Sequence, residues 1–174
     1  MNGDPTRPVP LTDTGREEAR LLGQELTGLR LDRGVCTRFG RTRETAEIAL
    51  AGRSLPLDVE PLLDDIAIGE LDGETHDDYD AWKHAHTRDD PFPGGESLND
   101  AARRYALGFR ELLAHPSGCT LVICHEIPIR YALNGATGSS ELDGPAHAIP
   151  NATPFLFDEG GLERAAARID ELAG

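Results

Sequence analysis

The stretch Thr120-Leu-Val-Ile-Cys124, followed by His125 and Glu126, decides the fold. Its continuous apolar run is typical of a strand that is buried on both faces in a parallel sheet. Apolar residues at helical spacing lie on both sides of it, in a helix that Ser97 should cap and in residues 129–133. A buried strand between two helices predicts an α/β domain.

The rest of the chain repeats this alternation. We expect further helices over 13–28 with Thr12 as the N-cap, 42–51, 76–85 and about 161–173, and further strands over 34–37, 57–59 and 153–157. The last strand should lie at an edge, because Pro154 cannot donate a ladder hydrogen bond. The pattern predicts a single domain over 1–174, built as a three-layer α/β/α fold around a mostly parallel sheet.

The composition excludes several classes of partner. A net charge of -14 disfavours nucleic acid and anionic membrane surfaces, which are held by clustered cations. No apolar run approaches the roughly 20 residues of a membrane span, and the first residues have no apolar core typical of a secretory signal. We therefore expect a cytoplasmic protein. Lys83 is the only lysine, so arginine must bind any phosphate group.

Cysteine and histidine spacing predicts no metal site and no cofactor. Cys36, Cys119 and Cys124 have no metal-ligand spacing and should be reduced thiols. His84-x-His86 offers two ligands without a matching carboxylate, which makes a poor metal site. Five histidines should be ordinary surface or core residues: His76, His84, His86, His115 and His147.

Polar residues follow two of the expected strands, at Cys36 to Arg41 and at Cys124 to Glu126. In open parallel sheets the active site lies at the carboxyl ends of the strands. If the two strands are neighbours, Arg41 and His125 lie on the same rim. The segment after the second strand, Cys124 to Arg130, also satisfies the C-x5-R spacing of cysteine-dependent phosphatases, although bulky isoleucines and Pro128 suit a phosphate-wrapping loop poorly.

Six fragments occur in order between about residues 10 and 157. They are Pro10-Leu-Thr-Asp-Thr-Gly15, Cys36-Thr-Arg-Phe-Gly-Arg-Thr-Arg-Glu-Thr-Ala46, Leu63-Asp-Asp-Ile-Ala-Ile-Gly-Glu-Leu-Asp-Gly73, Pro93-Gly-Gly-Glu-Ser97, Leu121-Val-Ile-Cys-His125 and Asn151-Ala-Thr153. Together they resemble the motifs of the histidine phosphatase superfamily, whose fold is phosphoglycerate-mutase-like. In this comparison Cys36 stands where the family's S-x-x-x-R-x-x-x-T-A segment has serine.

The resemblance implies roles for three residues. Arg41 should bind the phosphoryl oxygens, and His125 should be the second active-site histidine, donating to the same oxygens. Asp65 stands where the family has a glutamate that acts as general acid, with the neighbouring Asp64 as a competing choice. These roles imply a phosphomonoester hydrolase acting on a small phosphorylated metabolite.

The family also has a strand that ends in Arg-His-Gly, upstream of the first fragment, whose histidine attacks phosphorus. The nine residues before Pro10 contain no histidine, so the resemblance implies that this first strand and the nucleophile are missing from the printed chain. Losing an interior strand exposes two rows of backbone groups, so either the sheet closes over the gap, another segment fills it, or the fold is weak. We also expect a reading frame that begins upstream of Met1, and impaired hydrolysis.

Two further questions stay open at this stage. A chain without the nucleophile could instead be a catalytically inactive phosphate-ligand-binding or interaction domain. A phosphatase is favoured over a mutase, because residues 74–92 are shorter than the lysine-containing insertion of the mutases. Tyr79, Trp82 and His84 fit either a substrate pocket or the packed face of a helix. The substrate and the oligomeric state are not predicted.

Overall fold

The computed structural model describes residues 2–115, 118–146 and 148–174. Three parallel strands form one sheet in the order β2-β1-β3, with β1 over Arg33–Cys36, β2 over Leu57–Val59 and β3 over Thr120–Ile123. Val35 of β1 pairs with Val122 of β3 and with Asp58 of β2. The predicted parallel sheet is confirmed.

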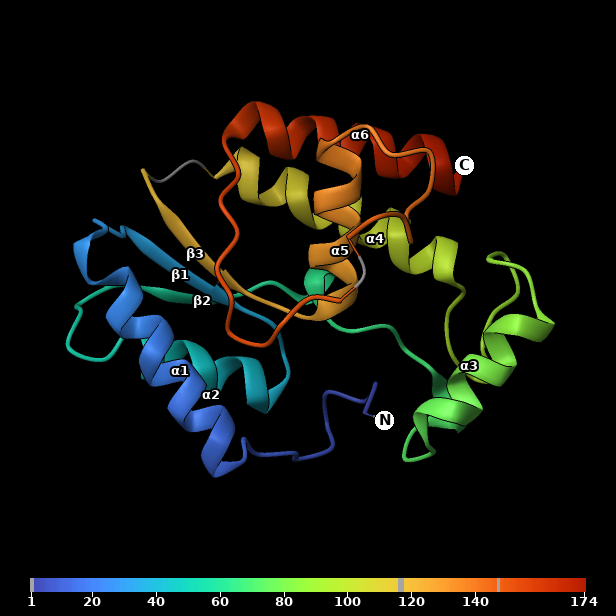
Figure 1. The fold of residues 1–174 in the computed structure, drawn as a ribbon, viewed down its shortest axis with the longest axis horizontal. Coiled ribbons are helices and arrows are strands. Elements are labelled where there is room, and N and C mark those ends of the chain that lie inside the picture. The colour runs from blue at the N-terminus through green and yellow to red at the C-terminus, as the bar shows by residue number, and fades with distance from the viewer. Residues whose placement is uncertain (1, 116–117, 147) are drawn as a thin grey trace.

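Helices cover both faces of this sheet (Figure 1). One layer holds α1 (Asp13–Glu25) and α2 (Gly40–Ala49), and the other holds α4 (Leu98–Ala114), α5 (Glu126–Ala136) and α6 (Glu159–Ala173). Two apolar cores lie between the layers and the sheet, a small one under α1 and α2 and a larger one under α4, α5 and α6. The three-layer α/β/α architecture is therefore confirmed.

The helix boundaries follow local capping chemistry. Thr12 Oγ1 accepts from the Gly15 N–H at the start of α1, and Ser97 forms a reciprocal capping box with Asp100 at the start of α4. Both caps are as predicted. The helix α3 (His76–Ala85) also has its predicted bounds and projects to the side of the sheet, away from the other helices (Figure 1).

The loop between β2 and α3 contains two short 3-10 turns, Pro61–Leu63 and Gly69–Leu71. Gly69 has a φ of +54°, and a Cβ there would lie 2.1 Å from the carbonyl oxygen of Pro93. Only glycine fits both the left-handed backbone and this close approach. The loop is thus held against the Pro93-Gly-Gly-Glu-Ser97 segment.

Two expectations about the sheet are wrong. Residues 153–157 form no strand, because no strand of the described chain pairs with them. The residues of β3 are only half-buried rather than buried on both faces, because β3 is the last strand of the sheet. No gap lies between the described strands, since β1 and β3 pair directly. The two edge strands of this sheet are β2 and β3.

None of the helices within the described ranges combines the length and the apolar character that a bilayer span requires.

Candidate active site

Arg41 and His125 meet at the carboxyl end of the sheet. Arg41 lies in the first turn of α2, just after β1, and His125 is the N-cap of α5, just after β3. Because β1 and β3 are neighbours, the two side chains converge, and Arg41 Nη2 lies 3.1 Å from His125 Nδ1. The sequence predicted this shared rim, and the geometry brings both residues to it.

The contacts of His125 fix its tautomer. Arginine nitrogens only donate, so His125 Nδ1 must accept from Arg41 and the proton must lie on Nε2. The Nε2–H group then donates to Thr37 Oγ1 at 2.9 Å, and Thr37 Oγ1 is 2.8 Å from Thr42 Oγ1. Burial, together with the positive charge of Arg41, holds the pKa of His125 well below its usual value. The imidazole is therefore neutral at neutral pH.

Asp65 completes the cluster. Its Oδ2 atom accepts from Arg41 Nη2 at 2.8 Å and lies 3.5 Å from His125 Nδ1. Burial raises the pKa of the Asp65 carboxyl, and the nearby Arg41 charge opposes that rise. A carboxyl with a raised pKa beside an arginine can carry a proton that it later donates.

The neighbouring carboxylate is directed elsewhere. Asp64 accepts from the backbone N–H and from Nε of Arg38, at 2.9 and 2.5 Å. Its side chain is 5% exposed. Of the two candidates for a general acid, Asp65 alone contacts Arg41 and His125 among the described residues.

Arg41 retains unused hydrogen-bond donors. All of its hydrogen bonds to described residues come from Nη2, which also donates to the carbonyl oxygen of Asn2 at 3.3 Å. Nε and Nη1 have no partner among those residues. The guanidinium lies 4.3 Å from the ring centroid of Phe39, and that ring makes an edge contact with His125. Phe39 therefore holds both side chains while leaving two arginine nitrogens available to an anion.

Two functional positions were missed by the sequence analysis. Thr37, and not Cys36, lies four residues before Arg41, which is the S-x-x-x-R spacing, and Thr37 is the residue that contacts His125. The assignment of Cys36 to the serine position is therefore wrong. Cys36 is buried in the core, and its burial raises the pKa of its thiol.

The second missed residue is Arg104 on α4. Its Nη1 donates to the carbonyl oxygens of Leu62 and Asp64, both at 2.9 Å, and its Nη2 donates to the carbonyl oxygen of Asp65 at 3.3 Å. Glu96 pairs with Arg104 at 2.5 Å and accepts the N–H of Ala67 at 2.9 Å. This clamp holds the loop that carries Asp65, and only the contact across 39 residues of sequence reveals it.

The C-x5-R alternative is disfavoured by the same geometry. Burial raises the pKa of the Cys124 thiol to about 12, so the sulfur is protonated rather than a thiolate. Arg130 pairs with Glu126 at 3.3 Å and with Asp143 at 3.0 Å. Tyr79 and Trp82 pack on Phe92, which supports the helix-packing alternative for them.

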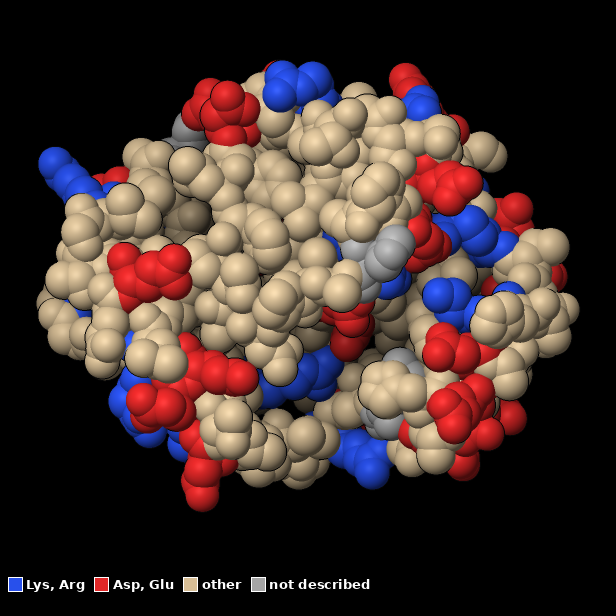
Figure 2. Space-filling view, viewed as in Figure 1, with Lys and Arg blue, Asp and Glu red and all other residues tan. Residues whose placement is uncertain are grey.

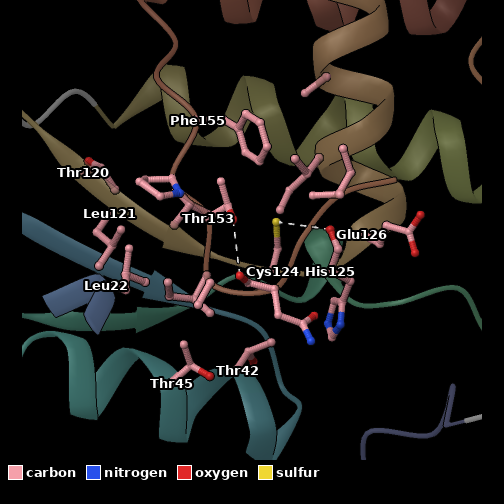
Figure 3. A pocket seen from close by; sticks show the side chains of 18 of the residues that line it. Leu22, Thr42, Thr45, Thr120, Leu121, Cys124, His125, Glu126, Thr153 and Phe155 are labelled. Carbon is pink, nitrogen blue, oxygen red and sulfur yellow. Dashed lines mark hydrogen bonds between the residues drawn. The ribbon is translucent and has the colours of Figure 1, made fainter. Parts of the chain in front are cut away.

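A groove of about 810 Å³ extends from the cluster along β3 (Figure 3). Arg41, Asp65 and His125 line its end, and His125 is the only histidine among the described residues that line it. Figure 2 shows a hollow near the middle of this face with both basic and acidic atoms at its edge. His147 lies outside the described residues.

Comparison with known proteins gives the same fold and family. The family model described as histidine phosphatase superfamily (branch 1) matches residues 5–165. A probable phosphoglycerate mutase, GpmB, from Photorhabdus laumondii is 29% identical over 147 residues, which are 80% of this chain and 66% of that protein. The match thus spans just under two thirds of the relative's length.

Two further proteins extend the comparison. The adenosylcobalamin/alpha-ribazole phosphatase of Escherichia coli is 32% identical over 83 residues, which are 43% of this chain and 41% of that one. The solved structure of Bacillus stearothermophilus YhfR superimposes with a TM-score of 0.72 at 26% identity, covering 84% of this chain and 77% of that chain. Since the family model covers almost the whole chain, this protein belongs to the histidine phosphatase superfamily.

Proposed function

We propose that this protein acts on the phosphomonoester group of a small phosphorylated metabolite, and that the complete reaction is hydrolysis. The observation that carries the proposal is the meeting of Arg41, His125 and Asp65 at one end of a groove, with Arg41 Nε and Nη1 directed to no described protein group. A guanidinium with two unused nitrogens can hold two phosphoryl oxygens at once. One of the relatives named above is an adenosylcobalamin/alpha-ribazole phosphatase, which supports the choice of a phosphatase.

Each residue has a distinct role in this proposal. Arg41 binds the phosphoryl oxygens and stabilises the charge that develops on the transferring group. Asp65, whose pKa is raised by burial, is the group placed to donate a proton to the leaving oxygen as the phosphorus–oxygen bond breaks and water takes the place of the leaving group on phosphorus. His125 lies beside the same oxygens, and its neutral state avoids a second buried cation next to Arg41.

His125 can also change which nitrogen donates. In the unliganded site Thr37 accepts from Nε2, but a hydroxyl can reverse its role and donate to Nε2 instead. The proton would then lie on Nδ1, which faces Arg41 and Asp65. Bound phosphate thus gains a donor from His125 without any change in net charge. Thr42, whose hydroxyl contacts Thr37, would supply the compensating hydrogen bond.

Turnover by residues 1–174 alone should be slow. Covalent phosphoryl transfer of the kind that the family uses needs a nucleophilic histidine besides the one that binds the phosphoryl group. His125 is the only histidine among the described groove residues, and using it as the nucleophile would remove a phosphate donor. A second candidate function follows from this observation: a domain that binds phosphorylated ligands without hydrolysing them.

The test measures binding and turnover separately. Inorganic phosphate binding is followed by calorimetry, and hydrolysis of p-nitrophenyl phosphate by release of p-nitrophenol. Arg41→Ala should weaken phosphate binding and lower any turnover about a hundredfold, since it removes the charged donor. Arg43→Ala is the matched control, because Arg43 lies on the same helix with an exposed side chain. Equal phosphate affinity in the two variants would contradict the proposal.

The outcomes also separate the two functions. Binding of phosphate with turnover that His125→Ala abolishes supports hydrolysis. Binding of phosphate without turnover supports the non-catalytic alternative. Failure of the wild-type chain to bind phosphate, under conditions in which it is folded by circular dichroism, would overturn both.

A further inference from the structure

A row of alternating charges begins beside His125 and follows α5. Arg130 Nη1 lies 3.3 Å from Glu126 Oε1, one helical turn away, and Arg130 Nη2 lies 3.0 Å from Asp143 Oδ1. Arg88, in the loop between α3 and α4, pairs with the other carboxylate oxygen of Asp143. We call Glu126, Arg130, Asp143 and Arg88 the charged row. It connects the start of α5 to the loop that precedes α4.

The first member of the charged row lies at the candidate site. Glu126 directly follows His125, and its negative charge acts on the pKa of Asp65. Figure 3 shows the Glu126 side chain directed away from Phe155, so the row leaves the site on the other side from the groove along β3. From His125 to Arg130 the helix rises about 7–8 Å. The row is therefore within reach of a ligand whose phosphoryl group lies beside His125.

Three members of the charged row are open to solvent. The exposed fraction of the side chain is 51% for Glu126, 32% for Asp143 and 31% for Arg88. Figure 2 shows acidic and basic atoms together at the edge of the hollow that lies between α5 and α3. A ligand in this hollow can contact both carboxylates without any change in the fold.

The charges of the row compensate one another. Two arginines and two carboxylates give a net charge of zero. Besides its ion pair with Asp143, Arg88 donates to Tyr131 Oη at 2.8 Å and to Asn99 Oδ1 at 3.0 Å. A second anion on the ligand would have to displace a carboxylate from an arginine, against the field of a chain with a net charge of -14. Arg41 differs, because two of its nitrogens have no partner among the described residues.

Two buried polar atoms beside the row lack a hydrogen-bond partner in the described part of the chain, Tyr79 Oη and Arg130 Nε. Tyr79 is 7% exposed and stacks on Phe92. The charges of Arg130, Asp143 and Asp65 act on the pKa of Tyr79, so its hydroxyl faces the row. Burial raises this pKa, and the neutral hydroxyl can both donate and accept. Since buried polar atoms are nearly always paired, the network is completed by a further group that donates and accepts.

We infer that the charged row binds the leaving alcohol of the substrate, and that this alcohol is an uncharged polyhydroxyl chain. The inference rests on the proposed function, because Arg41 holds the phosphoryl group. Hydroxyl groups donate to Glu126 and Asp143 and accept from the arginines without breaking an ion pair. A carboxylate or an ammonium group in their place meets a like charge in the row. The substrate class is therefore the phosphomonoester of a sugar or sugar alcohol.

The experiment compares three ligands that differ only at C1 of one six-carbon chain. Glucitol 6-phosphate carries a hydroxyl there, 6-phosphogluconate a carboxylate, and 1-amino-1-deoxyglucitol 6-phosphate an ammonium group. Calorimetry at neutral pH measures their affinities for the full chain beside that of inorganic phosphate. We expect glucitol 6-phosphate to bind at least about tenfold more tightly than inorganic phosphate and than either charged ligand.

Asp143→Asn tests the balance of charge, because it leaves the row with two arginines and one carboxylate. The preference for glucitol 6-phosphate over 6-phosphogluconate should fall at least about tenfold, with the affinity for inorganic phosphate unchanged. Asp170→Asn is the matched control, because it removes a carboxylate that pairs with Arg110 between α6 and α4, outside the row. Its preference should equal that of the wild type. Circular dichroism confirms that each variant is folded.

Tyr79→Phe is a second variant that keeps the stacking on Phe92 and removes only the unpartnered hydroxyl. It should weaken glucitol 6-phosphate about threefold to tenfold, as expected for one lost hydrogen bond, and leave inorganic phosphate unaffected. This variant decides the inference if Asp143→Asn does not fold. Equal affinity of Tyr79→Phe and wild type for glucitol 6-phosphate would then count against a ligand in the hollow.

The results that overturn the inference are distinct from those that overturn the proposed function. Equal or tighter binding of 6-phosphogluconate by the wild type would show a site for a second anion. Tighter binding of the amino ligand would assign the row to a cationic alcohol. An unchanged preference in folded Asp143→Asn would show that the row does not contact the ligand. In each case binding of inorganic phosphate leaves the proposed function standing, whereas its absence would overturn both.

Discussion

Two segments border the candidate site, and they are held in very different ways. The loop over residues 62–73 carries Asp65 and is tied by Arg104 at three carbonyl oxygens. It is tied again where Glu70 donates its N–H to Pro93 at 2.8 Å and Glu96 donates to Ala67 at 2.9 Å. The segment over 149–157 has no backbone hydrogen bond to the rest of the described chain.

The difference separates the segment on which the proposed chemistry depends from one that it does not need. The proposed general acid, Asp65, would have to be held to within a fraction of an ångström, and its loop is fixed by charged and backbone hydrogen bonds. Changes to the tied loop should affect both stability and phosphate binding, whereas changes to residues 149–157 should affect stability little.

The largest expected effect comes from removing Arg104, which together with Glu96 holds the loop over residues 62–73. Arg104→Ala leaves Glu96 and three carbonyl oxygens without their cation, and we expect a loss of about 3 kcal/mol in the free energy of unfolding. Urea unfolding followed by circular dichroism measures the loss. Arg103→Ala, on the same helix with a more exposed side chain, should cost clearly less. A loss from Arg104→Ala no larger than the control would mean that the loop is held by its backbone alone.

Glycine substitutions test how closely this loop packs against Pro93. Gly69→Ala places a Cβ against Pro93 at a positive φ, and we expect it to cost about 3 kcal/mol because strain and overlap add. Gly138 also has a positive φ, of +74°, but nothing lies within 4 Å of a Cβ there. Gly138→Ala should therefore cost only about 1 kcal/mol. Thermal unfolding of both variants measures the difference, and equal losses would remove the overlap from the explanation.

The pH dependence of the free energy of unfolding reports on two residues of the site, His125 and Asp65. The pKa of His125 is depressed in the folded state, so the unfolded state binds more protons just below pH 6.5. Stability from this residue is present above pH 6.5 and is lost as the pH falls toward the folded-state pKa, with a slope of up to about 1.4 kcal/mol per pH unit. The variant His125→Gln should lack this part of the acid loss.

The pH dependence of stability that Asp65 contributes has the opposite sign. Burial raises its pKa above 3.8 in the folded state, so its contribution is present at low pH and is lost as the pH rises through the raised value. Asp65→Asn should remove that loss. Urea unfolding from pH 4 to 8 for both variants separates the two residues, with His84→Gln as a control outside the site. Parallel curves for wild type and His125→Gln would contradict the assignment of a buried neutral imidazole.

The sequence predicted most of the architecture because the signals for it are local. The bounds of β2 and α3 agree with expectation since alternation, capping and helical spacing act over a few residues. Arg41 and His125 were found because each follows a strand. Strand formation at 153–157 was predicted from its apolar residues and is wrong, because a strand also needs a neighbouring strand, which the local pattern does not contain.

The missed parts of the site depend on contacts between distant segments. Thr37 is 88 residues from His125 in sequence, and its role follows only from the pairing of β1 with β3. Arg104 resembles any other arginine on a charged helix until its contacts with the carbonyl oxygens of residues 62, 64 and 65 are known. The place of β3 at the end of the described sheet also follows only from the strand order, since the sequence of β3 is that of an interior strand.

The smallest effects are expected in residues 149–157. Leu156 is 91% exposed, so Leu156→Ser should change the free energy of unfolding by less than about 0.5 kcal/mol. Phe157 packs partly against the core under α4 to α6, and Phe157→Ala should cost about 1–2 kcal/mol as part of that contact is lost. Chemical denaturation of the two variants measures both values. If Leu156→Ser cost as much as Phe157→Ala, Leu156 would have to be buried in solution, and the groove beside β3 would already be covered by this segment.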